Sequence, residues 1–242
     1  MTSLLRIGVL ISSSGTNLDA IITACNKKEI SGGVVVVGSD RASAAGLEKA
    51  QRAGSDTFVV DYKRYLSSSS SSTPNPSVIP KGVEIEKIMA FFEETEATTR
   101  GRLSAEIELL SHLQKYELDL LVLAGFMRQL TPYFITSFSP SDRLPKIMNI
   151  HPSLLPAFPG TDGYGDAFRY GCKVAGCTVH FVNEGLDAGP IIAQAAFPME
   201  EADTLKEVRQ KGLQKEWALY PHCIELYAQQ RLTIKNNRVC IQ

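Results

Sequence analysis

The sequence predicts an α/β fold of three layers, in which helices cover both faces of a mostly parallel, twisted sheet. Short apolar runs alternate with segments of helical spacing through the first half of the chain. Parallel strands need crossover connections, usually helices, so this alternation is typical of a parallel sheet that is buried on both faces. The chain has 242 residues, of which 44% are hydrophobic, and this is enough for one substantial core. We therefore expect a single domain over residues 1–242.

Each expected element rests on a local pattern. Short runs of β-branched and aliphatic residues predict buried strands, and apolar residues at helical spacing, such as Leu18, Ile21 and Cys25, predict helices. The expected strands lie at 6–11, 34–37, 57–60, 118–124, 146–150 and 178–180, and the expected helices at 18–25, 44–53, 83–116 and 204–230. A break of the third helix near 98–101 is left open.

Residues 62–82 interrupt the alternation. They contain an unbroken run of serines at 67–72, followed by Thr73, Pro74, Asn75 and Pro76. Such a composition cannot bury enough apolar surface to offset the entropy that is lost on ordering. We expect a flexible Ser/Pro-rich surface insertion here, without a catalytic role.

The most informative segment is 146–156, where an apolar strand ends in polar residues and prolines. Asn149 and His151 are two positions apart, so in an extended strand their side chains point to the same side. Pro152 then ends the strand, and the carboxyl ends of strands are where open parallel sheets place their sites. Asp187 follows on a turn-like segment. Taken singly, these residues are most simply a cap, a structural histidine and a turn former, but together they supply an amide, an imidazole and a carboxylate.

The loop at 12–17 joins the first expected strand to the first helix and is a second candidate site. Backbone N–H groups at a helix start form an anion site with the helix dipole behind them, and Gly15 lets the backbone approach a phosphate. Thr16 and Asn17 can add hydrogen bonds or cap the helix. The loop lacks a Walker lysine and a full dinucleotide-binding glycine pattern, so from composition alone a simple helix cap is equally compatible.

Charge and cysteine content limit the class of protein. The net charge is −1, with acids and bases mixed along the chain, which argues against a nucleic-acid or membrane partner. The sequence has no apolar run that is long enough to span a bilayer, and we expect no signal peptide. The five cysteines are an odd number without zinc-ligand spacing, so we expect reduced thiols, a cytoplasmic location and no metal.

A series of motifs, in this order, resembles those of the folate-dependent formyltransferases. The motifs are AGFMR at 124–128, NIHPSLLP at 149–156, GCTVHFV at 176–182 and LDAGP at 186–190. The likeness runs from about Arg6 to Leu232 and is strong for the members that act in de novo purine synthesis. It implies a Rossmann-like formyltransferase fold. It also implies transfer of the formyl group of 10-formyltetrahydrofolate to the amine of 5′-phosphoribosylglycinamide.

The resemblance further implies roles for particular residues. Asn149, His151 and Asp187 match the family's catalytic positions. His180 would support them from behind, and a purely structural role for it is equally compatible. The residues implied in binding the substrate phosphate are Gly15, Thr16, Asn17 and Arg102, with Arg100 as the competing arginine. The residues implied in binding folate are Met127, Arg128, Gln129, Leu130, Asn149, Val182, Asn183, Glu184, Gly185 and Leu186.

The chemistry implied is a direct acyl transfer. The substrate amine attacks the formyl carbon, and the oxygen that gains charge takes hydrogen bonds from Asn149 and from a protonated His151. Asp187 holds the ring, favours its protonated form and moves the amine proton to the departing nitrogen through water. Because the amine is itself the nucleophile, we expect neither a covalent acyl-enzyme nor a metal.

One segment, at 161–168, departs from the family pattern. Asp162 and Tyr164 stand where histidines are usual, and the neighbouring glycines indicate a flexible loop, so altered activity or folate affinity is compatible with the sequence. Three competing functions stay open at this point. They are a formyltetrahydrofolate deformylase-like hydrolase, a nucleotide-binding protein on the same scaffold, and a methionyl-tRNA formyltransferase, which would need a further domain for tRNA. We expect small-molecule partners, no nucleic acid and no membrane, and a monomer or homodimer.

Overall fold

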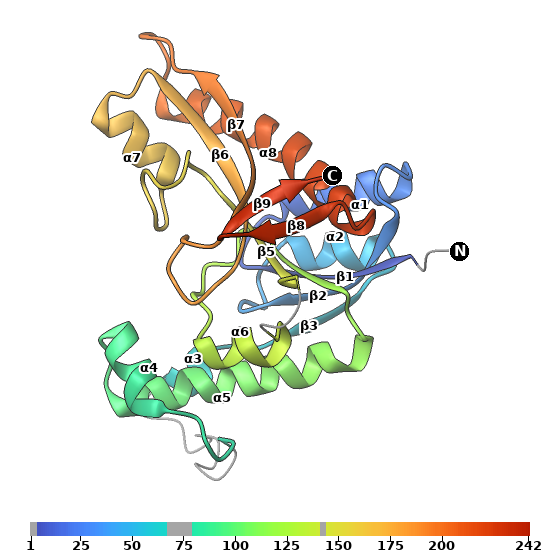
Figure 1. Ribbon diagram of the computed structural model, residues 1–242, viewed down its shortest axis with the longest axis vertical. Coiled ribbons are helices and arrows are strands. Elements are labelled where there is room, and N and C mark those ends of the chain that lie inside the picture. Colours follow the sequence, from blue (N-terminus) through green and yellow to red (C-terminus); the bar gives the residue numbers. More distant parts are fainter. Residues whose placement is uncertain (1–3, 67–78, 141–143) are drawn as a thin grey trace.

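The computed structural model describes residues 4–66, 79–140 and 144–242, and its centre is a seven-stranded sheet (Figure 1). The strands are β1 (Leu5–Ile11), β2 (Gly32–Ser39), β3 (Asp56–Val59), β4 (Leu120–Leu123), β5 (Ile147–His151), β6 (Val174–Phe181) and β7 (Ile191–Pro198). Their order in space is β3-β2-β1-β4-β5-β6-β7. The pairs from β3 to β5 are parallel, whereas β6 pairs antiparallel with both β5 and β7. The mostly parallel α/β sheet predicted from the sequence is confirmed.

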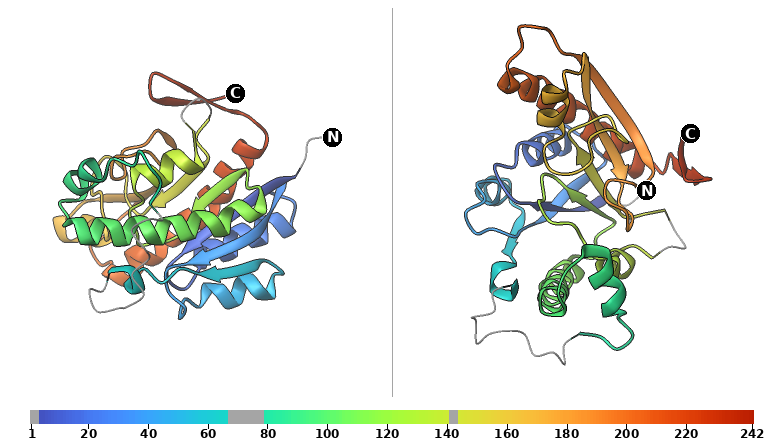
Figure 2. Two further views of the ribbon diagram at one scale, coloured as in Figure 1. Left: turned by 90° about the horizontal axis from the view of Figure 1, so that it is seen from below. Right: turned by 90° about the vertical axis from the view of Figure 1, so that its left-hand side faces the viewer.

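Helices cover both faces of this sheet (Figure 1, Figure 2). On one face lie α1 (Thr16–Asn26), α2 (Gly46–Arg52) and α8 (Leu205–Ala228), and on the other lie α5 (Glu96–Leu113) and α6 (Pro132–Phe138). Successive residues of β1 point to opposite faces of the sheet. Val9 packs on the side of α1 and α8, and Leu10 packs on the side of α5 and α6. Burial on both faces explains why these strands read as continuous apolar runs.

The strand order reverses between β1 and β4, because the chain first adds β2 and β3 on one side and later β5 on the other. The loops that follow β1 and β4 therefore diverge at the carboxyl ends of the strands, which is where open α/β sheets bind ligands. Two hydrogen bonds of Ser12 join these loops. Its N–H donates to Gly125 O at 3.1 Å, and its hydroxyl accepts the Met127 N–H at 2.8 Å.

The region of the predicted insertion is ordered at its first residues. Tyr62 is buried, and α3 (Lys63–Leu66) follows it and packs against α5. Most of the predicted insertion, residues 67–78, lies outside the described residues. The predicted helix at 83–116 is divided into α4 (Ile85–Phe92), α5 and the short 3-10 turn η2 (Gln114–Tyr116).

The break between α4 and α5 lies at 93–95, not near 98–101. Glu93 adopts a left-handed backbone conformation (φ 53°), and Thr95 caps α5 by accepting the Thr98 N–H at 3.3 Å. Gly101 is inside α5, where a Cβ would lie 2.3 Å from the carbonyl oxygen of Tyr65. This glycine therefore permits the close approach of α3 and does not interrupt the helix.

The last third of the chain places α7 (Gly163–Tyr170) between β5 and β6, and a hairpin of β8 (Leu232–Lys235) and β9 (Arg238–Ile241) after α8. The buried hydroxyl of Tyr220 lies 3.0 Å from carbonyl oxygens of both β4 and β5, which anchors α8 against the strands that form the site. Among the helices of the described residues, none combines the length and apolar character that a bilayer crossing requires.

Glu106 of α5 gives the fold a specific pH dependence. It is fully buried and accepts hydrogen bonds from the N–H of Thr131, at 2.9 Å, and from the hydroxyl of the same residue. Burial raises the pKa of Glu106 to about 7, although the bonds from Thr131 oppose the rise. A carboxyl whose pKa is higher in the folded state stabilises the fold at acidic pH and loses that contribution as pH rises through the folded pKa.

We therefore expect the free energy of unfolding of the wild type to fall by up to about 3 kcal/mol between the pKa of an unfolded glutamate and neutral pH. Glu106→Gln should remove this component and leave a flatter profile. Urea unfolding of both proteins at a series of pH values measures the difference. Identical pH profiles would show that Glu106 titrates normally.

Candidate active site

A cavity of about 560 Å³ opens at the carboxyl ends of β1, β4 and β5. The loops after β1, β4, β5 and β6, Ile135 of α6 and one turn of α8 complete its wall. Every residue that the sequence predicts for the site lines this cavity, with the exception of Arg102. Within the described residues, no group of three or more His, Cys, Asp or Glu side chains is placed to hold a metal ion.

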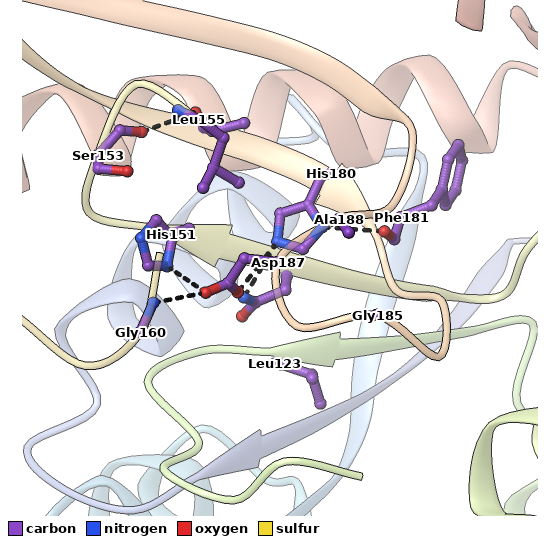
Figure 3. Close-up of polar contacts among 12 residues, drawn as sticks. Leu123, His151, Ser153, Leu155, Gly160, His180, Phe181, Gly185, Asp187 and Ala188 are labelled. Carbon is purple, nitrogen blue, oxygen red and sulfur yellow. Dashed lines mark hydrogen bonds and ion pairs between the residues drawn. The ribbon is translucent and has the colours of Figure 1, made fainter. Parts of the chain in front are cut away.

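His151 ends β5 and is 2% exposed. Its Nε2 donates to the carbonyl oxygen of Phe158 at 2.8 Å. Its Nδ1 lies 3.3 Å from Asp187 Oδ2 (Figure 3). Both neighbours are acceptors, and only an imidazolium carries a proton on each ring nitrogen. An imidazolium at this position donates to both neighbours.

Asn149 faces His180 across the β5–β6 pair, where the two residues are register partners. His180 Nδ1 donates to Phe181 O at 2.9 Å, which leaves Nε2 of the neutral ring as an acceptor. Burial lowers the pKa of His180, with the backbone bond and Asp187 opposing the shift, so the ring stays neutral beside that carboxylate. Nε2 accepts the amide N–H of Asn149 at 3.3 Å. The second N–H of this amide is thus available to a ligand in the cavity.

Asp187 is held by the loop between β6 and β7. Its backbone lies in the left-handed region (φ 47°), which aspartate tolerates better than most residues. Its Oδ2, which faces His151, also accepts the Gly160 N–H at 2.9 Å (Figure 3). The loop closes against β6 at Gly189, where a Cβ would lie 1.8 Å from the carbonyl oxygen of Phe181. The backbone of β6 thus leaves no room for a side chain two residues after Asp187.

The loop after β1 brings backbone N–H groups to the cavity at the start of α1. Gly15 precedes the helix in the left-handed conformation (φ 67°), and the first helical hydrogen bond runs from Asp19 N–H to Gly15 O at 3.0 Å. The N–H groups before Asp19 have no acceptor within the helix. With the helix dipole behind them, these groups can bind an anion.

The side chain of Asn17 turns away from this anion site. Its Nδ2 donates to Glu216 Oε2 of α8 at 2.6 Å, in a buried contact. Glu216 thus occupies one N–H of the Asn17 amide in this structure, and a hydrogen bond from this side chain to a phosphate stays a prediction. The backbone N–H of Asn17 remains in the first turn of α1.

Arg102 lies behind the wall of the cavity. Its guanidinium forms an ion pair with Glu94, donates to Gln129 O at 3.1 Å and lies 4.2 Å from the centre of the Phe92 ring. Glu94 belongs to the turn between α4 and α5, so the position of this turn decides where the arginine points. In this structure an intramolecular carboxylate occupies the guanidinium, and the role of Arg102 in binding a phosphate stays a prediction.

Arg128, by contrast, lines the cavity, and Asp40 and Tyr62 hold its guanidinium in place. Its Nε donates to Asp40 Oδ2 at 2.7 Å, and its guanidinium lies 5.0 Å from the centre of the Tyr62 ring. The Asp40 side chain has no exposed area. A buried carboxylate is tolerated only when it is paired, so Asp40 and Arg128 depend on each other for their positions.

Residues 161–168, which depart from the family pattern, include the start of α7. Asp162 caps this helix with its side chain, and Tyr164 is buried against α8. Most of this segment is helical and not a loop. A Cβ on Gly163 would lie 2.5 Å from Pro152 O, so this glycine is there for close packing.

Sequence reasoning missed three groups that shape the site, namely Phe158, Gly160 and Glu216. Phe158 and Gly160 act through their backbone, so their side chains carry no signal. Glu216 had a weak signal. It lies on the buried face of α8 with Gly212 and Tyr220, one turn away on either side, where an acid is unusual.

The sequence matches a family model described as formyl transferase over residues 5–224. The chain belongs to the formyl transferase family. Phosphoribosylglycinamide formyltransferase of Escherichia coli (strain K12) is 35% identical to this formyltransferase over 233 residues, which are 96% of this chain and 92% of that protein. The trifunctional purine biosynthetic protein adenosine-3 of Homo sapiens is 33% identical over 236 residues. This match spans 97% of the formyltransferase but only 20% of the human protein.

Solved structures share the architecture of this formyltransferase. Glycinamide ribonucleotide transformylase 1 from Symbiobacterium toebii has a TM-score of 0.79 and 43% identity, and the match covers 100% of this chain and 95% of that one. Phosphoribosylglycinamide formyltransferase from Anaplasma phagocytophilum has a TM-score of 0.76 and 35% identity, with 98% and 93% covered. A formyltetrahydrofolate deformylase from Pseudomonas syringae is 20% identical, with a TM-score of 0.74, and this likeness concerns the fold alone. The resemblance read from the sequence motifs is confirmed.

Proposed function

We propose that this protein transfers the formyl group of 10-formyltetrahydrofolate to the amine of 5′-phosphoribosylglycinamide, a step of de novo purine biosynthesis. One observation carries the proposal. Asn149, His151 and Asp187 meet in one cavity, beside a helix start at Gly15 that suits a phosphate. Relatives of nearly the same length that are named phosphoribosylglycinamide formyltransferase support it.

The catalytic step is a direct attack of the substrate amine on the formyl carbon. As the new C–N bond forms, the formyl oxygen gains negative charge and accepts the uncommitted N–H of Asn149. His151 stabilises the same charge as a cation. Its N–H groups are directed at Phe158 and Asp187, so direct donation to the oxygen requires release of one of these contacts.

Proton transfer completes the reaction. The attacking amine becomes more acidic as it bonds to the formyl carbon, and Asp187 accepts its proton through water. The C–N10 bond of the folate then breaks, and the departing N10 receives that proton. Because the amine is itself the nucleophile, this route needs neither a covalent acyl-enzyme nor a metal.

The two substrates occupy different parts of the cavity. Backbone N–H groups at Gly15, Thr16 and Asn17 bind the nucleotide phosphate. The folate lies between the residues at 127–130 and the loop at 182–186, where apolar walls and backbone groups suit a flat pteridine. The cavity volume of about 560 Å³ is typical of small-molecule sites, which range over roughly 300–1,000 Å³.

The setting that fits this activity is the cytoplasm. All five cysteines are free, which suits a reducing compartment. The protein acts on small molecules, with 10-formyltetrahydrofolate as co-substrate, and it does so as a monomer or a homodimer.

Incubation of the purified protein with glycinamide ribonucleotide and 10-formyltetrahydrofolate tests the proposal. We expect tetrahydrofolate and the formylated nucleotide to appear in equal amounts. Release of tetrahydrofolate without the nucleotide would identify a deformylase-like hydrolase instead. Nucleotide binding without turnover would identify a binding protein on the same scaffold.

Arg102 is proposed to bind the nucleotide phosphate after it leaves Glu94. Arg102→Ala should raise the KM for the nucleotide about tenfold or more and change kcat little, because a charge-assisted hydrogen bond to phosphate is lost. Steady-state kinetics with varied nucleotide measure both constants. Arg100→Ala is the matched control, since Arg100 pairs with exposed Glu96. An unchanged KM in Arg102→Ala would show that the phosphate uses another cation.

A further inference from the structure

Tyr164 does not line the cavity, yet it is connected to it through one buried carboxylate. Its hydroxyl donates to Glu216 Oε1 at 2.7 Å, while Asn17 Nδ2 donates to Glu216 Oε2 at 2.6 Å. Both oxygens of the carboxylate are thus engaged, one from α7 and the other from α1. Glu216 is 5% exposed and lines the cavity, so this connection reaches the site itself.

The packing around Tyr164 shows how closely α8 is adapted to it. The tyrosine is 5% exposed, and its ring centroid lies 6.0 Å from that of Phe197. Gly212 lies one turn before Glu216 on α8, and a Cβ there would be 2.2 Å from Tyr164 Cζ. Gly212 leaves room for the ring, and Glu216 accepts the hydrogen bond from the hydroxyl. The two residues together accommodate the Tyr164 side chain on α8.

We propose that Tyr164 is a positioning residue for the nucleotide, because it holds Glu216 and, through Glu216, fixes Asn17 in the first turn of α1. The backbone N–H groups of that turn then keep the orientation that a phosphate requires. The side chain of Tyr164 touches neither substrate in this arrangement. The inference rests on the proposed function, since it assigns Tyr164 a part in binding the nucleotide substrate.

If Tyr164 acts through Glu216, the affinity for the nucleotide depends on the protonation of Glu216. A purely structural role of Tyr164 would not produce this pH dependence. Burial raises the pKa of Glu216, whereas the hydrogen bonds from Asn17 and Tyr164 lower it. The other titratable groups that interact with it are His151 on β5, Cys177 on β6 and Tyr220 on α8. Without the Tyr164 hydroxyl, Glu216 takes up a proton at a higher pH, and its bond from Asn17 weakens there.

Tyr164→Phe keeps the ring beside Gly212 and removes only the hydroxyl. We expect the KM and the calorimetric Kd for glycinamide ribonucleotide to rise about tenfold, with kcat little changed. We also expect the affinity to begin its fall on acidification at a higher pH than in the wild type. Tyr170→Phe removes an exposed hydroxyl from the same helix, where the tyrosine is 81% exposed, and should change none of these quantities.

Two further variants test the connection. If Tyr164 acts through Glu216, the double variant Tyr164→Phe/Glu216→Gln should bind nucleotide no worse than Glu216→Gln alone. Gly212→Ala displaces the ring and should reproduce the loss of affinity with the tyrosine present. Additive losses in the double variant, or an unchanged Kd in Tyr164→Phe, would overturn the inference.

Binding and turnover measured on the wild-type protein distinguish a failure of this inference from a failure of the proposed function. If the wild type binds the nucleotide but transfers no formyl group, the proposed function fails, and the calorimetric comparison of Tyr164→Phe still decides the inference. If the wild type transfers the formyl group and Tyr164→Phe matches it in KM and pH profile, the inference alone is wrong. If the wild type does not bind the nucleotide, both are wrong.

Discussion

Asp187→Asn is expected to lower kcat by about a hundredfold or more and to leave the affinity for the nucleotide nearly unchanged. Asp187 Oδ2 accepts the Gly160 N–H and lies 3.3 Å from His151 Nδ1. An asparagine can keep the bond from Gly160 through its carbonyl oxygen, so the loop should stay in place. The variant loses the negative charge beside the His151 ring, together with the group that receives the amine proton.

Single-turnover kinetics and calorimetric titration with glycinamide ribonucleotide measure the two effects separately. Asp166→Asn is the matched control for the loss of one negative charge, because Asp166 lies on α7 and pairs with Arg169 near the surface. A defect of Asp187→Asn that appears only in KM would contradict its role in the chemical step.

Gly189→Ala is expected to reduce kcat by about a hundredfold without removing any catalytic side chain. A Cβ at this position would lie 1.8 Å from Phe181 O and 3.3 Å from Asn183 N, both of them backbone atoms. Backbone of β6 cannot yield as a flexible side chain would, so the loop that carries Asp187 must move. A shift of about 1 Å in a catalytic group is enough for a loss of this size.

The same kinetic assay, with the midpoint of urea unfolding as a check on folding, tests this expectation. Gly33→Ala is the matched control, because a Cβ at Gly33 of β2 would meet nothing within 4 Å. If Gly189→Ala retains the kcat of the wild type, the close approach at Phe181 does not set the position of Asp187.

The parts of the site that the sequence predicts are those governed by short-range geometry. Asn149 and His151 share one side of β5 because alternation along a strand is a local property. Asp187 is placed beside them only by the resemblance of the motifs, because β6 runs antiparallel to β5 and the loop that carries Asp187 starts opposite Met148. The direct contact of its Oδ2 with the His151 ring depends on Gly160 and Gly189, whose backbone contacts no local pattern encodes.

The features that the sequence leaves unpredicted depend on distant contacts. Arg102 is on the expected helix, but its direction is set by Glu94 across the turn between α4 and α5. Gly101 reads locally as a helix breaker, whereas the approach of Tyr65 makes it a packing residue. Tyr164 reads as a departure from a family pattern, and its partner Glu216 is remote in sequence.

The bonds of Ser12 have a consequence for how the two substrates influence each other. One residue ties the turn proposed to hold the phosphate to the segment proposed to hold the pteridine. A ligand that stiffens either segment lowers the entropy that the other must lose on binding. Cooperativity of this kind is reciprocal, so the factor by which the nucleotide tightens folate binding equals the factor by which folate tightens nucleotide binding. Neither order of addition is then privileged by the equilibrium, and any preferred sequence of binding must arise from rates.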